Sequence, residues 1–93
     1  MKKFEHKTYG KIEVSDITTK QYEDYGEMMG GTPRGYTKFR VDTLKAFLTL
    51  GLAKCEPELK PEDVDDLKPA KTLWLSNCIS EVIAEAITID PLA

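Results

Sequence analysis

Four carboxylates stand close together in the segment PEDVDD at positions 61–66. Oxygen ligands at alternate positions open an EF-hand calcium loop, which also needs a glycine at its sixth position and a glutamate at its twelfth. Counted from Asp63, those positions hold Lys68 and Trp74. We therefore interpret the segment as a helix entrance, where acids are favoured by the helix dipole, and expect no metal site.

The other reactive side chains form no recognisable catalytic set. His6 is the only histidine, and no serine or cysteine signature accompanies it, so we expect an exposed side chain without a catalytic role. Gly30 and Gly35 have the interval of a phosphate-binding loop, but Tyr36 stands where that motif requires lysine. The sequence predicts a protein that is not an enzyme and has no cofactor.

Two cysteines, Cys55 and Cys78, lack the paired C-x2-C spacing of a zinc site. In a reducing compartment we expect them to be free, partly buried thiols, because cysteine is a common small core residue. Cys78 falls on an apolar helical stripe, so we expect its replacement to cost more stability than replacement of Cys55.

Length and charge exclude several classes of protein. The 93 residues predict a single small domain, 1–93, with 41% hydrophobic and 31% charged residues. The net charge of -3 and the scattered lysines argue against a nucleic-acid partner. No apolar run reaches the length of about 20 residues that spans a bilayer, so we expect no membrane partner and a cytoplasmic location.

The first half of the chain predicts a hairpin and one helix. Polar and apolar residues alternate along 4–14 around a glycine turn, which favours a short β-hairpin. Thr18 or Thr19 is suited to cap a following helix, whose apolar stripe is formed by Tyr22, Tyr25 and Met29. The glycine-rich stretch 30–36 ends this helix.

The second half predicts two further helices joined by a short turn. One runs from 37 to 50, and a single turn follows at 61–67. The longest helix runs from 69 to 89, with two sets of side chains. Its apolar stripe consists of Leu75, Cys78, Ile79, Val82, Ile83 and Ala86. Its polar side consists mostly of Ser76, Asn77, Ser80, Glu81 and Glu85. The expected fold class is α+β, a short N-terminal hairpin packed on about three helices, predominantly helical. In the helix over 37–50, the residues expected to face the core are Phe39, Leu44, Phe47 and Leu48.

Additional apolar residues lie outside the main stripe of the last helix. They either complete a central core helix or form an exposed face for a partner protein or a second copy of the chain. Arg34, in the glycine-rich connection, either is solvated or contacts an acidic group. On the partner-binding hypothesis, the interface residues are Trp74, Leu73, Ile87, Ile89, Arg34 and Tyr36.

The order of these segments resembles the small tail assembly chaperones of long-tailed bacteriophages. A strand pair leads into VSDITTKQYEDY, followed by FRVDTLKAFLTLGL and LKPEDVDDLKPAKTLWLSNCISEVI. The last segment fits the family pattern L-x-P-E-x-V-x-x-L before an amphipathic helix. Ile87 and Ile89 stand where family members often carry an aromatic residue.

This resemblance implies a non-enzymatic protein that binds the tape-measure protein and keeps its long apolar helices in solution during tail assembly. The family has no catalytic residues to transfer to this chain. Two other functions are considered. The first is a small phage- or bacterium-encoded inhibitor or regulatory module that binds a host protein, and the second, disfavoured by the lack of a site, is an enzyme subunit.

Overall fold

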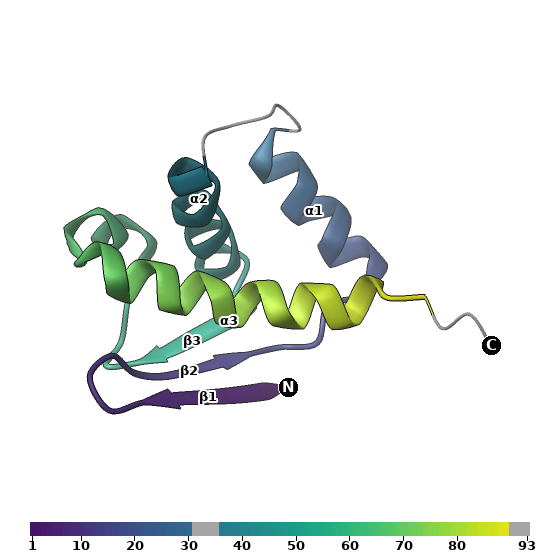
Figure 1. Cartoon of the computed structure of the whole chain (residues 1–93). Coiled ribbons are helices and arrows are strands. Elements are labelled where there is room, and N and C mark those ends of the chain that lie inside the picture. The colour runs from purple at the N-terminus through teal and green to yellow at the C-terminus, as the bar shows by residue number, and fades with distance from the viewer. Residues whose placement is uncertain (31–35, 90–93) are drawn as a thin grey trace.

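In the computed structural model, which describes residues 1–30 and 36–89, a three-stranded antiparallel sheet carries α-helices on one face (Figure 1). The elements in chain order are β1 Lys2–His6, β2 Gly10–Val14, α1 Thr19–Met29, α2 Tyr36–Thr49, β3 Ala53–Glu56, the 3-10 helix η1 Pro61–Asp66, and α3 Pro69–Ile87. The fold is α+β and mostly helical, as expected.

The N-terminal hairpin is confirmed, with β1 and β2 in the register Phe4↔Ile12 and His6↔Gly10. Three residues, 7–9, form its turn. Gly10 has a φ of +90°, which is the left-handed region that disfavours a side chain. A Cβ at this position would also collide with the backbone oxygen of Glu56 on β3. Glycine is therefore required both by the turn and by the close approach of the third strand.

The third strand, β3, was not predicted. It pairs antiparallel with β2, with Cys55 opposite Ile12 and Ala53 opposite Val14. Its four residues alternate buried and exposed side chains. An alternation over only four residues does not distinguish a strand from a loop in the sequence. The segment becomes a strand because it pairs with β2.

Helix α1 begins at the expected cap. The Gln21 N–H donates to Thr18 Oγ1 at 3.2 Å, and the Thr18 N–H donates to Gln21 Oε1 at 2.9 Å. This reciprocal pair is a capping box, which satisfies backbone donors that the first turn leaves free. Tyr25 is buried, but Tyr22 remains 41% exposed, so the predicted apolar stripe is wrong at that position.

The core lies between the sheet and the two helices α2 and α3. The Tyr25 ring meets the Phe47 ring edge-on at 5.3 Å between centroids and joins α1 to this core. Phe39 was expected to face inward but is 42% exposed. The large side chains without solvent exposure are Ile12, Val14, Leu44, Phe47 and Ile79.

Helix α3 is buried on two sides rather than one. Its predicted stripe is confirmed at Leu75 and Val82, which are buried, but Ala86 is exposed. Ser76 was expected on the polar side and is instead completely buried. An Arg40 guanidinium N–H on α2 donates to Ser80 Oγ, one turn further along α3, at 2.6 Å. Two serines one turn apart share a face, and their small side chains let α2 cross α3 closely.

Candidate functional site

The predicted interface residue Trp74 lies against the hairpin rather than on a free face. Its ring centroid is 5.4 Å from that of His6 and 6.1 Å from that of Tyr9. His6 was expected to be exposed but is half-buried, stacked on Tyr9 at 4.4 Å. The Thr8 N–H donates to His6 Nδ1 at 3.0 Å and fixes the imidazole in the turn. This aromatic cluster fastens the hairpin to α3.

Leu73 is rotated by about 100° from Trp74 around α3 and is half-buried. It borders a hollow of about 230 Å³ between α2, η1 and the start of α3. Val41 and Leu67 contribute apolar side chains to the same hollow. Leu73 and Trp74 therefore belong to different surfaces, although they are adjacent in the sequence.

The C-terminal end of α3 carries the most exposed of the predicted residues. Ile87 is 51% exposed, and Ile89, just beyond the helix, is 87% exposed. Arg34 lies outside the described residues. Tyr36 begins α2, and its side chain is not among those described. Of the four predicted residues whose side chains the structure describes, only Ile87 and Ile89 are exposed.

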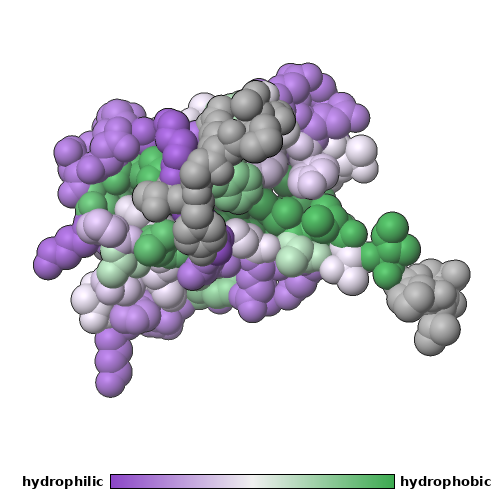
Figure 2. Space-filling view, turned by 45° about the horizontal axis from the view of Figure 1, so that its top comes forward, coloured by the Kyte–Doolittle hydropathy of each residue, from purple (hydrophilic) through white to green (hydrophobic). Residues whose placement is uncertain are grey.

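We call this surface, formed by Ile83, Ile87 and Ile89, the apolar end. The contacts of α1 are made mainly with α2, and no contact of similar extent joins α1 to α3 among the described residues. In Figure 2 hydrophobic side chains gather along this end of α3, beside the hydrophilic surface of α1. The last turn is held by a hydrogen bond from Thr88 Oγ1 to the Ala84 carbonyl at 2.5 Å. Within the apolar end, Ile83 is partly buried against the core, whereas Ile87 and Ile89 are exposed.

Three further large apolar side chains of the described helices are exposed and were not assigned to an interface from the sequence. They are Tyr22, Met28 and Phe39. Periodicity placed Tyr22 and Phe39 inward, because it locates the apolar face of a helix but does not show where the neighbouring helix stops covering it.

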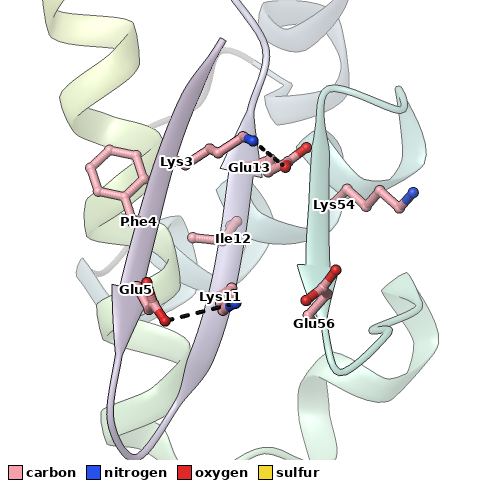
Figure 3. Close-up of a pocket in the computed structure, with 8 residues that line it drawn as sticks. All are labelled: Lys3, Phe4, Glu5, Lys11, Ile12, Glu13, Lys54 and Glu56. Atoms are coloured by element: carbon pink, nitrogen blue, oxygen red, sulfur yellow. Dashed lines mark ion pairs between the residues drawn. The ribbon is translucent and has the colours of Figure 1, made fainter.

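The outer face of the sheet carries a regular pattern of charge (Figure 3). Its strand register forms two rows of opposite charges, Lys3–Glu13–Lys54 and Glu5–Lys11–Glu56. Within these rows the Lys3 ammonium lies 3.5 Å from the Glu13 carboxylate, and that of Lys11 lies 3.8 Å from Glu5. The rows line a shallow depression of about 360 Å³. Neighbouring charges cancel, so this face has a varied local potential but no net charge.

The acidic segment is confirmed as a helix entrance. Val64 is 2% exposed and anchors η1 in the core, while Asp65 accepts from the Lys45 ammonium at 2.9 Å. In residues 1–30 and 36–89 no three His, Cys, Asp or Glu side chains are placed to hold a metal ion together.

Both cysteines are free thiols, as expected, and both are buried. Burial raises the pKa of Cys78 to about 11, with a further contribution from the negative charge of Glu81. Burial also raises the pKa of Cys55, and the nearby Lys71 partly opposes this shift. β3 places Cys55 in the core as well, opposite Ile12, and the smaller loss expected for replacement of Cys55 stays a prediction.

These pKa shifts predict a loss of stability in alkali. The thiols of the unfolded chain ionise near their ordinary pKa, whereas the folded Cys78 keeps its proton up to about pH 11. The folded state then binds more protons, so the free energy of unfolding falls as pH rises from about 9 to 11. Chemical denaturation across this range should give a shallower decline for Cys78→Ala than for the wild type. If the free energy of unfolding declined equally with pH in the two proteins, the raised pKa of Cys78 would be contradicted.

No family model, curated protein or solved structure matches this chain. Among the helices of the described residues, none combines the length and the apolar character required to cross a membrane.

Proposed function

We propose that this chain is a non-enzymatic assembly chaperone that binds an apolar helical segment of another protein. The observation that carries the proposal is the apolar end of α3, where Ile87 in the last turn and Ile89 just beyond the helix are exposed. Contiguous exposed apolar residues of this kind mark protein interaction sites. The partner favoured by the resemblance is a phage tape-measure protein, and the proposed site of action is the cytoplasm of a bacterial host.

The shape of the apolar end suits a helical partner. Ile83 and Ile87 are one turn apart on α3, so they lie on one face and offer the spacing that an apolar helix stripe can pack against. Full burial of one isoleucine contributes about 1.5–3 kcal/mol, so a few such contacts give a reversible complex. A chaperone requires such reversibility, because the partner must leave it for the final assembly.

Two acidic side chains in the last turns of α3 lie on the side of the helix away from Ile83 and Ile87, because residues two apart are separated by about 200° around the helix. Glu81 and Glu85 project from the same half of α3, with side chains 57% and 61% exposed. Both lie near the Lys2 ammonium, at 3.8 Å and 2.6 Å respectively. These carboxylates therefore hold Lys2 of β1 and do not border the apolar end.

Co-expression tests the proposal. The tape-measure protein encoded in the same genome should be recovered in the soluble fraction when the wild-type chain is present. Ile87→Lys should abolish this effect while the variant itself stays folded, because the side chain is at the surface. Asn77→Lys is the matched control, since Asn77 is an exposed position on the same helix and the same charge is introduced.

Equal solubility of the tape-measure protein with and without the chain would contradict the tape-measure assignment. If Ile87→Lys kept as much tape-measure protein in the soluble fraction as the wild type does, the assignment of the interface to the apolar end would be contradicted. Unfolding of Ile87→Lys, seen as loss of the helical circular dichroism signal, would show instead that Ile87 belongs to the core.

A further inference from the structure

The outer edge of β3 is an unpaired sheet edge. β3 is the last strand of the order β1-β2-β3, and its pairing among the described residues is with β2 alone. An edge strand exposes backbone donors and acceptors on the side away from its neighbour, and these groups can pair with another strand. β3 therefore offers a position at which a strand can be added.

The charges of β3 differ from those of the other two strands. On β1 and β2, Lys3 pairs with Glu13 and Glu5 pairs with Lys11. Lys54 and Glu56 have no ion pair within residues 1–30 and 36–89, although each lies opposite a charged residue of β2. In Figure 3 the Lys54 side chain extends away from β2, past the free edge of the sheet.

The opposite edge, at β1, is less open. The Lys2 ammonium lies 2.6 Å from the Glu85 carboxylate, and Phe4 shares a surface hollow with Trp74 and Cys78 of α3. Figure 3 shows α3 running beside β1. Side chains of α3 thus lie next to the β1 edge, so an added strand would meet the helix there.

Space is present beside β3. A groove of about 330 Å³ follows this edge, lined by apolar side chains, among them Leu48, Cys55 and Leu59, and by the charged residues Lys54, Glu56 and Glu58. A strand added to β3 would place one face over this groove and the other in line with the charged outer face of the sheet. The added strand must therefore be apolar on one face and carry alternating charges on the other.

We propose that the added strand is β3 of a second copy of this chain, paired antiparallel about Cys55. Cys55 then lies opposite Cys55 of the partner subunit, and Lys54 lies opposite Glu56 of the partner subunit. Residues opposite each other in an antiparallel pair share a face, so a shift by one residue would set Lys54 against a core position. Only this register joins the two outer faces with opposite charges in contact.

The charge rows continue without a break across this pairing. The row Lys3–Glu13–Lys54 meets Glu56 of the partner subunit, so the sign of the charge alternates along all six strands. Opposite charges directly across two strands stabilise the pair, and like charges destabilise it. The interface is small, with four residues in each strand, so the dimer should be weak and depend on concentration. This self-association goes beyond the proposed function and leaves the apolar end of α3 accessible.

Charge reversal at β3 tests the proposal directly. Sedimentation equilibrium of the wild type at up to about 1 mM should show a monomer–dimer equilibrium. Lys54→Glu sets two glutamates of one subunit against two of the other, and Glu56→Lys does the same with lysines. Each variant alone should dimerise about tenfold more weakly than the wild type. An equimolar mixture should recover association, because glutamates then face lysines.

The mixture also controls for misfolding, because each subunit carries the same substitution whether the variants are measured alone or together. Lys3→Glu is the matched control on the β1 edge and should leave the dimer unchanged. A wild type that stays monomeric at the highest concentration would overturn the proposal. So would a mixture that associates no better than its components, or a dimer that Lys3→Glu weakens as strongly as Lys54→Glu.

Discussion

An alanine in place of Phe47 should lower the free energy of unfolding by about 3–5 kcal/mol. The Phe47 side chain is completely buried and touches α1 through the Tyr25 ring, 5.3 Å away. Its removal therefore leaves a cavity where α1 packs on α2 as well as reducing the apolar area buried. Small domains are stable by about 5–15 kcal/mol in total, so this variant should be close to unfolding at 37 °C. Urea denaturation followed by circular dichroism measures the difference.

Phe39 provides the matched control, because it lies on the same helix and is 42% exposed. Phe39→Ala should cost less than about 1 kcal/mol. Similar losses for the two variants would show that the packing of α2 has been assigned to the wrong face.

Gly10→Ala should destabilise the protein by more than about 2 kcal/mol. A non-glycine residue in left-handed geometry costs about 1–2 kcal/mol, and Gly10 has a φ of +90°. The added Cβ would also meet the backbone oxygen of Glu56, which cannot move without displacing β3 from β2. The two effects together should separate the third strand from the hairpin.

Gly26→Ala should have the opposite sign. Gly26 lies inside α1, and a Cβ there meets no atom within 4 Å. Alanine should therefore stabilise the helix by about 0.5–1 kcal/mol through reduced backbone entropy in the unfolded chain. Thermal melts of the two variants should shift in opposite directions, and a shift in the same direction would contradict the placement of one of these glycines.

The sequence was informative where local chemistry alone determines structure. Thr18 and Gln21 form a capping box, the alternation along 4–14 predicts the hairpin, and Pro61 and Pro69 mark the starts of η1 and α3. These signals act over a few residues, so they are readable without knowledge of the tertiary packing.

The sequence was less informative where a distant element decides the environment. Ser76 is polar yet fully buried, because α2 crosses α3 beside it. Trp74 is of a residue type that often anchors interfaces, but the rings of His6 and Tyr9 in the hairpin pack against it. Phe39 follows the helical period and still faces outward. In each case periodicity identifies an apolar or polar face, whereas the neighbour that covers it depends on the tertiary arrangement of the elements.

The candidate site could be predicted only in part for the same reason. Ile87 and Ile89 were identified because α3 carries more apolar residues than one stripe needs, and both are exposed. The charge rows of the sheet were not foreseen, because they require β3, which the sequence did not reveal.

A binding titration shows whether the apolar end of α3 binds an apolar helix of the tape-measure protein, as we propose. A labelled helical peptide from that protein is titrated with the wild type, Ile87→Lys and Asn77→Lys, and fluorescence anisotropy is recorded. We expect saturable binding by the wild type and Asn77→Lys, and an affinity at least about tenfold lower for Ile87→Lys, equivalent to about 1.4 kcal/mol. Equal affinities for all three proteins would contradict this proposal.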